Sequence, residues 1–392
     1  MEYQQNRTWM EVSLDNLTHN FRLLSDMAGP TCPLMGILKC NASGLGAPFI
    51  AKELEAAGCT FFGVATVEEG MELRDCGITT PLLIFGAIDF SHVPVCAQNK
   101  LTLSVFGHAY ASALSEAASH CDAAIDVHLK VDTGLARYGI ALDKDMEGAV
   151  MQAKQIATLP GLALKGVYSH AANAGEPVDD EYTLRQFSLF CEFTSRLAES
   201  GLRLVRHFAN SPTLMRFPQM RLDMVRSAAV MNGFNILRPE VPLREVASLK
   251  TRIISIRELS PGDTLSYSRL YTAQRKTRIG VIPLGYGDGM PRCVGNRAFF
   301  LTWGKKVPLI GKLCMDVSFI DITDVPEASI GDIVTVFGQD GEAFQSVFAI
   351  ANLLPGAAPE VTTVLGRRIP RFYLRNGKIV GRDTHTYSHR AF

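Results

Sequence analysis

Short apolar runs rich in β-branched residues recur through the first 235 residues, with stretches of helical spacing between them. Each run has the length of one buried strand in a parallel sheet. The eight runs are Leu34 to Leu38, Phe61 to Ala65, Leu82 to Phe85, Leu101 to Phe106, Ala124 to Val131, Leu164 to Tyr168, Leu204 to Phe208 and Met224 to Met231. Because eight strands close a parallel barrel, the pattern predicts the α/β class and a (β/α)8 barrel of the TIM type.

Two of the intervening helices are predicted by their own signals. Leu184 and Phe187 begin a row of apolar positions three or four apart, and Gly201 follows as a stop. Near the N-terminus, Ser13 can cap a helix that begins at Leu14. These signals support an alternation of helices and strands.

After about residue 245 the pattern changes to closely spaced strands joined by turn residues such as Ser260-Pro261-Gly262-Asp263. The predicted strands are Ser248 to Ile256, Thr277 to Leu284, Lys306 to Ile310, Val317 to Ile322 and Ile333 to Phe337. The change of pattern near Pro242 predicts two domains. They are a barrel over residues 1–243 and a mainly β C-terminal domain over residues 244–392.

Composition narrows the class of partner and the compartment. The chain has 39 basic and 39 acidic side chains, so it lacks the basic excess that nucleic-acid binding requires. It has no apolar stretch of about 18 residues, and its nine cysteines are spread singly, without a disulfide framework or a zinc pattern. We therefore predict a cytoplasmic protein that binds a small molecule and no metal, membrane or nucleic acid.

Reactive side chains gather where the predicted barrel strands end, which is where such barrels carry their active sites. Lys39 follows the first strand, Asp132 ends the fifth, His170 follows the sixth and Ser211 the seventh, while Arg226 lies on the eighth. We expect a lysine at this rim to be partly buried, which lowers the pKa of its amine and suits it to a Schiff base. The alternative is an ordinary solvated lysine.

A series of motifs runs in one order along nearly the whole chain. They are Val12-Ser13-Leu14-Asp15-Asn16-Leu17, Lys39-Cys40-Asn41-Ala42-Ser43-Gly44, His128-Leu129-Lys130-Val131-Asp132-Thr133-Gly134-Leu135-Ala136-Arg137, Phe208-Ala209-Asn210-Ser211, Met224-Val225-Arg226, Ser266-Tyr267, Ile282-Pro283-Leu284-Gly285-Tyr286-Gly287-Asp288-Gly289, Gly311-Lys312-Leu313-Cys314-Met315-Asp316 and Arg368-Ile369-Pro370-Arg371. In this order the chain resembles the alanine racemases, fold-type III enzymes that use pyridoxal phosphate. The resemblance implies a homodimer that racemises L- and D-alanine, with serine as an example of a broader range.

The resemblance also implies roles for individual residues. Lys39 would hold the cofactor and serve as the base on one face of the substrate's α-carbon, and Tyr267 of a second subunit would serve on the other. Racemisation needs two such groups, because a proton removed from one side is returned from the other. Cofactor binding is implied for Lys39, Ser43, His170, Ser211, Arg226, Ala228, Ala229 and Arg367, and substrate binding for Arg137, Met315 and Tyr286. Without the family, Tyr267 reads as a strand tyrosine at a turn.

Two basic residues have chemistry that bears on the reaction, and each also has an alternative structural role. Arg226 would contact the pyridine nitrogen, and a guanidinium, with a pKa above about 12, donates a hydrogen bond without releasing its proton. The ring nitrogen then stays unprotonated, which favours reprotonation of the α-carbon over transamination. Arg226 paired with Asp223 is the alternative. Lys130 matches a lysine that some family members carbamylate to hold Arg137, and its alternative is an interior lysine paired with Asp132.

The chain departs from the family at the phosphate site. Ser43 and Leu45 stand where the family usually has a tyrosine and a histidine, and Arg367 stands where it often has a second tyrosine. Both missing tyrosines ordinarily contact the phosphate. We expect Ser43, Ser211 and the backbone amides near Ala228 and Ala229 to serve instead, with Arg367 adding a charged contact.

Departures at the entrance leave the substrate open. Arg292 and Lys312 match entrance positions, and Gly175 replaces a common acidic residue, so a cationic entrance that admits larger or acidic amino acids is an alternative. A fold-type III decarboxylase and a non-catalytic cofactor-binding homologue are further alternatives. Cys314 directly before Met315 is the racemase arrangement and disfavours the decarboxylase.

Overall fold

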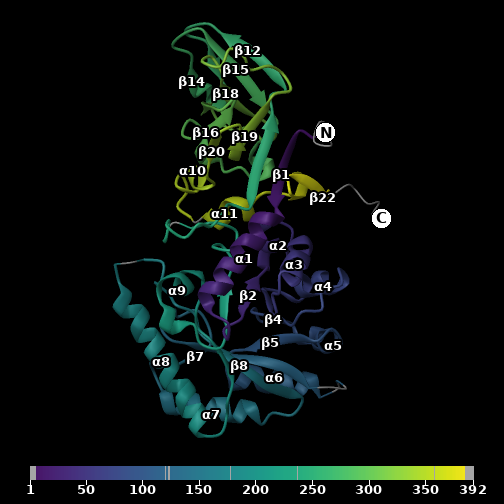
Figure 1. The fold of residues 1–392 in the computed structure, drawn as a ribbon, viewed down its shortest axis with the longest axis vertical. Coiled ribbons are helices and arrows are strands. Elements are labelled where there is room, and N and C mark those ends of the chain that lie inside the picture. Colours follow the sequence, from purple (N-terminus) through teal and green to yellow (C-terminus); the bar gives the residue numbers. More distant parts are fainter. Residues whose placement is uncertain are drawn as a thin grey trace.

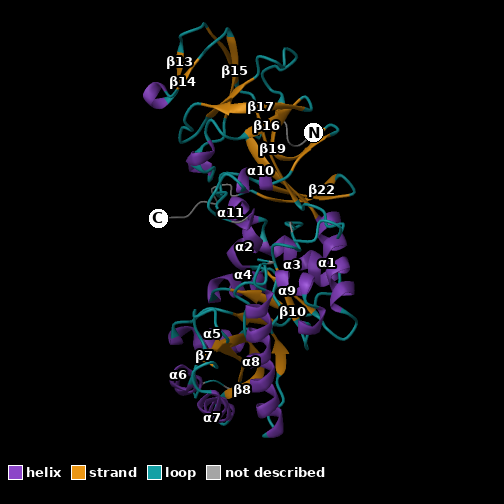
Figure 2. Cartoon of the chain, turned by 90° about the vertical axis from the view of Figure 1, so that its left-hand side faces the viewer, coloured by secondary structure: helices purple, strands orange, loops and turns teal. Residues whose placement is uncertain are grey.

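The structure is a computed structural model that describes residues 6–119, 121, 124–176, 178–235, 237–356 and 358–384. Its two parts lie end to end along the longest axis, with a helix-covered barrel at one end and a β-rich domain at the other (Figures 1 and 2). Among the described residues, no helix has both the length and the apolar character needed to span a membrane.

The barrel consists of parallel strands, each paired with the next. Eight strands make it up within the described ranges: β2 (Leu34–Ile37), β3 (Phe62–Val64), β4 (Leu82–Ile84), β5 (Leu101–Val105), β6 (Ile125–Asp132), β8 (Leu162–Tyr168), β9 (Val205–His207) and β10 (Val225–Ser227). β10 pairs with β2, and β7 (Ile140–Ala141) pairs in parallel with the end of β6. Between β9 and β10, the Arg226 amide donates to the Ala209 carbonyl at 3.0 Å, which closes the wall. The predicted (β/α)8 barrel is confirmed.

Helices cover the outside of the barrel (Figure 2). They are α1 (Leu14–Ala28), α2 (Lys39–Gly44), α3 (Ala47–Ala56), α4 (Val67–Asp75), α5 (Val93–Gln98), α6 (His108–Ala118), α7 (Met146–Ala157), α8 (Asp180–Glu199) and α9 (Ser211–Arg216). Ser13 caps α1 by accepting a hydrogen bond from the Asn16 amide, as predicted. α8 covers the predicted apolar row, and Gly201 follows it at φ +88°.

The C-terminal part is mainly β, as predicted. Its strands are β11 (Ala247–Arg252), β12 (Ser255–Leu259), β13 (Thr264–Leu265), β14 (Tyr271–Thr272), β15 (Thr277–Ile282), β16 (Phe299–Thr302), β17 (Lys305–Ile310), β18 (Ser318–Asp321), β19 (Ile333–Asp340), β20 (Ala343–Gln345), β21 (Arg371–Arg375) and β22 (Lys378–Asp383). The short helices α10 (Phe348–Ala351) and α11 (Ala358–Thr363) lie between β20 and β21. β13 and β14 pair separately, as a small hairpin.

The first strand of the chain belongs to the β sheet of the C-terminal part. β1 (Thr8–Ser13) pairs antiparallel with β11 and parallel with β21. The sequence-based division had assigned these residues to the barrel. Its partners lie more than 200 positions away along the chain, so no local signal reveals the pairing. Two connections therefore join the parts, one at Ser13 and one before β11, and the boundary at residue 243 stays a prediction.

Candidate active site

Lys39 is the first residue of α2, immediately beyond the end of β2. The four residues after it, Cys40 to Ser43, have φ between 53° and 57° and form a left-handed turn. Such a backbone costs about 1–2 kcal/mol for each non-glycine residue. The side chain of Lys39 is exposed. The expected partial burial of Lys39 is therefore wrong for the single chain.

The later part of this turn is anchored by the β domain. Arg371 donates from Nε to the Gly44 carbonyl at 3.1 Å, and the Tyr373 hydroxyl donates to the Leu45 carbonyl at 3.0 Å. Gly44, at φ +85°, packs so closely that a Cβ would lie 2.1 Å from the Thr362 carbonyl oxygen. Strand β21 and helix α11 thus hold the segment that carries Lys39.

Arg226 is a buried cation of the site, with 4% of its surface exposed. It donates to the backbone carbonyls of Ser169 (2.8 Å), His207 (2.6 Å) and Phe208 (3.0 Å). Burial lowers the pKa of its guanidinium to about 10, so it keeps its charge at neutral pH. Its alternative pairing with Asp223 is wrong, because Asp223 binds Arg206 at 2.8 Å.

Two buried histidines continue from Arg226 into the barrel. Arg226 Nη1 lies 3.0 Å from His207 Nδ1, and His207 Nε2 lies 2.9 Å from His128 Nδ1. A guanidinium only donates, so His207 Nδ1 accepts, and its proton lies on Nε2 and is donated to His128. Burial lowers the pKa of His128 to about 4, and burial with the Arg226 charge lowers that of His207 well below 6.5. Both rings are neutral, so the only charge in this row is the guanidinium.

His170, at the end of β8, lies beside Arg226. Arg226 Nη2 is 3.4 Å from His170 Nδ1, and Asn210 Nδ2 is 3.2 Å from His170 Nε2. Burial, followed by the charges of Arg226 and Arg137, lowers the pKa of His170 well below 6.5. A donor faces each ring nitrogen, which disfavours the doubly protonated ring, and the neutral imidazole accepts a hydrogen bond from one of the two donors.

Lys130 is fully buried within β6. Burial lowers the pKa of its amine from its usual 10.5 to about 7, and the amine donates to the Val131 carbonyl. The expected ion pair with Asp132 does not form, because the Asp132 carboxylate accepts from the amides of Gly134 (2.7 Å), Ala136 (3.2 Å) and Arg137 (3.0 Å). Carbamylation of Lys130 stays a prediction.

Arg137 follows the loop that Asp132 orders, and its side chain is exposed. Its guanidinium carbon lies 5.0 Å from the centre of the Tyr138 ring, a distance at which a cation is attracted to an aromatic face. The amine of Lys130 lies 5.9 Å from the same ring. Tyr138 therefore lies close to both basic residues, and sequence reasoning did not single it out.

The predicted phosphate donors divide into two sets. Ser211 is buried, lies 3.2 Å from the Ser227 hydroxyl, and accepts from the Ala228 amide at 3.2 Å. Among the described residues, the amide of Ala229 donates to no other group. Ser43 lies in the left-handed turn. Arg367 is exposed and, within the described ranges, makes no hydrogen bond or ion pair, so its contact with the phosphate stays a prediction.

The remaining predicted site residues lie on the β domain and are exposed. Tyr267 is 65% exposed, Met315 54% and Tyr286 37%. The strands that flank Tyr267, β13 and β14, lie at the end of the β domain away from the barrel in both views (Figures 1 and 2). The structure therefore brings Lys39, His170, Ser211 and Arg226 to one barrel rim and does not bring Tyr267 to them within one chain.

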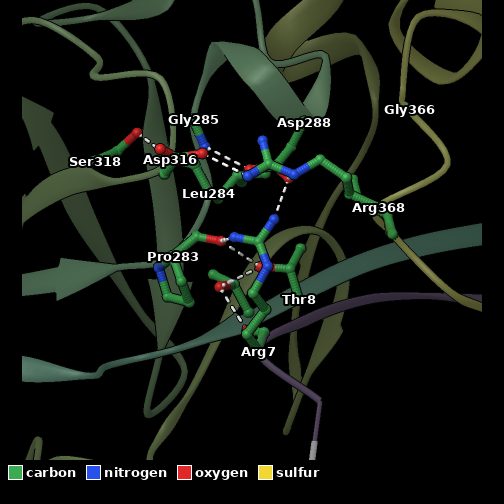
Figure 3. A network of polar contacts seen from close by, with 12 residues as sticks. Arg7, Thr8, Pro283, Leu284, Gly285, Asp288, Asp316, Ser318, Gly366 and Arg368 are labelled. Atoms are coloured by element: carbon green, nitrogen blue, oxygen red, sulfur yellow. Dashed lines mark hydrogen bonds and ion pairs between the residues drawn. The ribbon is translucent and has the colours of Figure 1, made fainter. Parts of the chain in front are cut away.

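A buried carboxylate orders the loop that carries Tyr286 (Figure 3). Asp288 is fully buried, accepts from the Gly285 amide at 3.0 Å, and pairs with Arg7 and Arg368. The amide of Gly287 donates to the Met315 carbonyl at 2.8 Å, which joins the two loops. A Cβ on Gly285 would lie 2.3 Å from that carbonyl oxygen, so this close approach requires glycine.

Several residues of the site were assigned no role from the sequence. They are Glu69, His128, Tyr138, His207, Asn210 and Asp288. His128 and His207 lie on barrel strands and are buried, so a polar residue inside an apolar run was the available signal. Asp288 lies among glycines in a motif that carries the resemblance, and its buried ion pairs have no separate signal in the sequence.

The barrel, the β domain and the placement of Lys39 and Arg226 at neighbouring strands agree with the class that the resemblance implies, the barrel enzymes that use pyridoxal phosphate. The N-terminal domain model of alanine racemase matches residues 12–234, and the C-terminal domain model matches residues 246–373. The chain belongs to the alanine racemase family and is an alanine racemase-like isomerase. Members of this family use pyridoxal phosphate and act on amino acids.

Individual relatives agree over nearly the full length. Alanine racemase 1 of Caldanaerobacter subterraneus subsp. tengcongensis is 36% identical over 378 residues, covering 95% of this chain and 96% of its own. The alanine racemase of Clostridium difficile 630 superposes with a TM-score of 0.91 at 30% identity, covering 97% and 99% of the two chains. That of Bacillus anthracis with bound L-Ala-P gives 0.90 at 30% identity, covering 97% and 98%.

Proposed function

We propose that this protein racemises an amino acid with the help of pyridoxal phosphate bound at the barrel rim, and that alanine is its preferred substrate. The observation that carries the proposal is the pairing of β2 with β10. The pairing sets Ser227 opposite Gly36, which brings Lys39 and Arg226 to the ends of neighbouring strands. The relatives that are alanine racemases support the same choice of substrate.

The side chains at the rim fit this cofactor. Lys39 offers an exposed amine to its aldehyde, and Arg226 offers a fixed cation to its ring nitrogen. The Ser211 hydroxyl and the Ala229 amide, which has no acceptor among the described residues, are donors suited to phosphate oxygens. Bound there, pyridoxal phosphate would withdraw electrons from the α-carbon of an amino acid attached to it, which acidifies its hydrogen.

Residues of the protein then transfer the proton of the α-carbon. The Lys39 amine takes it from, or returns it to, one face of the α-carbon, and the Tyr267 hydroxyl of a second subunit does so on the other. Arg226 would donate a hydrogen bond to the ring nitrogen and keep its proton, because its pKa of about 10 lies well above neutral pH. The neutral His170 and His207 leave this hydrogen bond undisturbed, since neither adds a second charge.

Substrate binding is proposed for residues from both parts. Arg137 suits a carboxylate because its guanidinium presents two parallel donors. The Met315 amide has no acceptor within the described residues and is available as a further donor. Tyr286 would narrow the substrate entrance beside Met315. Since Tyr267 and Met315 are exposed on a single chain, we propose a homodimer in which the partner's β domain covers the barrel rim.

A broader substrate range is the second candidate. Arg292 lies 5.3 Å from the centre of the Tyr286 ring, and the Lys312 amine donates to the Ser268 hydroxyl at 2.9 Å, next to Tyr267. Two cations near Tyr286 and Tyr267 favour substrates with polar or acidic side chains. The replacement of two phosphate tyrosines by Ser43 and Arg367 favours larger ones.

A substrate panel tests both candidates. Initial rates for L-alanine, L-serine, L-aspartate and L-glutamate are measured by chiral chromatography, with α-deuterium uptake from D2O followed in parallel. We expect the highest kcat/KM for alanine and deuterium in both enantiomers. Faster racemisation of serine or an acidic amino acid selects the second candidate. Loss of CO2 identifies a decarboxylase, and cofactor binding without deuterium uptake identifies a non-catalytic homologue.

A further inference from the structure

Glu69 connects two loops at the barrel rim. It lies in α4, the helix that follows β3, and is half-buried. Its Oε1 accepts the Cys40 amide at 2.5 Å, and its Oε2 accepts the Ala65 amide at 2.7 Å. One carboxylate thus joins the loop after β2 to the loop after β3.

This use of Glu69 goes beyond capping its own helix. A glutamate at the third helical position commonly accepts the amide of the N-cap residue. In α4 the N-cap is Thr66, whose hydroxyl accepts the Glu69 amide at 3.3 Å. The Glu69 carboxylate bypasses the Thr66 amide and reaches Ala65 and the neighbouring loop instead. The Thr66 hydroxyl therefore caps α4, and the Glu69 carboxylate binds the backbone of the segment beside Lys39.

The segment it holds has an unfavourable backbone. Cys40 to Ser43 are left-handed and contain no glycine, so the turn depends on contacts from outside. The contacts from Arg371 and Tyr373 reach its far end, at Gly44 and Leu45. In the part of the chain that the structure describes, Glu69 is the side chain that bonds to the backbone at Lys39 or Cys40. It fixes the peptide group directly after the lysine.

We propose that Glu69 is a positioning residue, which fixes the direction in which the Lys39 amine leaves the barrel rim. This inference rests on the proposed function, because the direction of the Lys39 amine matters for catalysis only if Lys39 binds the cofactor and transfers the proton. A carboxylate suits the task because it accepts two amide hydrogens at once through charge-assisted hydrogen bonds. An amide in its place presents one oxygen and one N–H group, so one backbone amide would face another donor.

The matched variants are Glu69→Gln and Glu68→Gln. Glu68 is the exposed neighbour on the same helix and bonds to neither loop backbone. The first measurement is residue-resolved hydrogen exchange at Cys40 and Ala65 in the protein as purified. We expect exchange at one or both amides to be at least about tenfold faster in Glu69→Gln and unchanged in Glu68→Gln. Unchanged exchange in Glu69→Gln overturns the proposal.

The second measurement follows the amine itself. Cofactor-depleted protein is mixed with pyridoxal phosphate, reduced with borohydride at timed intervals, and the adduct at Lys39 is quantified by mass spectrometry. We expect attachment to slow about tenfold or more in Glu69→Gln, and kcat to fall by more than KM changes. Faster exchange combined with wild-type attachment and kcat also overturns the proposal, because loss of the Glu69 hydrogen bonds would then have no effect on Lys39.

The two measurements separate this proposal from the function on which it rests. An absence of any adduct at Lys39 in the wild-type protein refutes the proposed function. The exchange measurement needs no cofactor and still decides whether Glu69 holds the turn. The melting temperatures of the two variants are compared as well, and rescue of attachment by Glu69→Asp but not by Glu69→Gln supports a role for the carboxylate.

Discussion

The barrel half of the candidate site and its β-domain half differ in how their side chains are held. On the barrel, Arg226 is 4% exposed, and its guanidinium is bonded to three backbone carbonyls and to His207. On the β domain, Tyr267 and Met315 are more than half exposed. The barrel half is complete within one chain, whereas the β half presents its groups on a surface.

The β half is nevertheless well ordered in its backbone. Asp288 pairs with Arg7 and Arg368 (Figure 3). The loops of Tyr286 and Met315 share backbone hydrogen bonds. More than half of the surface of Tyr267 and of Met315 is exposed. A rigid backbone that presents exposed aromatic and apolar side chains is typical of a surface that covers another molecule. The comparison therefore supports a site divided between two subunits. The barrel of one subunit supplies the buried Arg226 cation, and the β domain of the other supplies the second proton donor.

The largest expected effect comes from the barrel half. Lys39→Ala should abolish racemisation and the borohydride-fixed adduct, because no other group at the rim offers an amine in the same place. Since Lys39 is exposed, its loss should leave the melting temperature close to that of the wild type. Chiral chromatography and differential scanning calorimetry measure the two properties.

Mixing subunits provides the control for a divided site. Lys39→Ala and Tyr267→Ala proteins are each expected to be nearly inactive. After unfolding and refolding together, half of the dimers should contain one of each, and each mixed dimer should hold one intact site of two. About a quarter of the wild-type activity should then return. No recovery in refolded mixtures that do form mixed dimers contradicts the shared site.

A smaller effect is expected from the β half. Tyr267→Phe removes only the hydroxyl, so proton transfer should slow by about 10²–10⁴-fold on one face of the α-carbon. Because Tyr267 is 65% exposed, stability should not change. Deuterium uptake into each enantiomer under single-turnover conditions, starting from L- or D-alanine, identifies the affected face. Equal slowing from both enantiomers contradicts the assignment of Tyr267 to one face.

The barrel was predictable because its signals are local. Each strand is a short buried run and each connection is short, so the pattern alone gave the order of the elements. Lys39, His170, Ser211 and Arg226 were found for the same reason, since each lies where such a run ends. β1 was missed because its partners, β11 and β21, are close only in space.

The side-chain environments were harder to predict. Lys39 is exposed and is followed by a left-handed turn of four residues without glycine. Intrinsic backbone preferences disfavour such a turn, and contacts from residues distant in the sequence hold it. The partner of Asp223 depended on whether β9 or β10 supplied the arginine, and Arg206 of β9 supplies it. Such pairings depend on strand register and close packing, which a single sequence does not encode locally.

The smallest expected effect concerns the buried amine of the barrel half. Burial lowers the pKa of Lys130 from 10.5 to about 7, so between these values the unfolded chain binds more protons at this residue than the folded chain. Folding stability should therefore rise with pH from about 7 to 10.5 through Lys130, and below pH 7 the full penalty for its burial remains. In Lys130→Met this contribution should be absent.

The measurement is the melting temperature of wild type and variant at pH 7 and pH 9.5, under nitrogen to exclude carbamylation by CO2. The wild type should gain relative to Lys130→Met as the pH rises. Lys306→Met, at an exposed lysine of the β domain, should parallel the wild type at both values. A constant difference between wild type and Lys130→Met would contradict the lowered pKa.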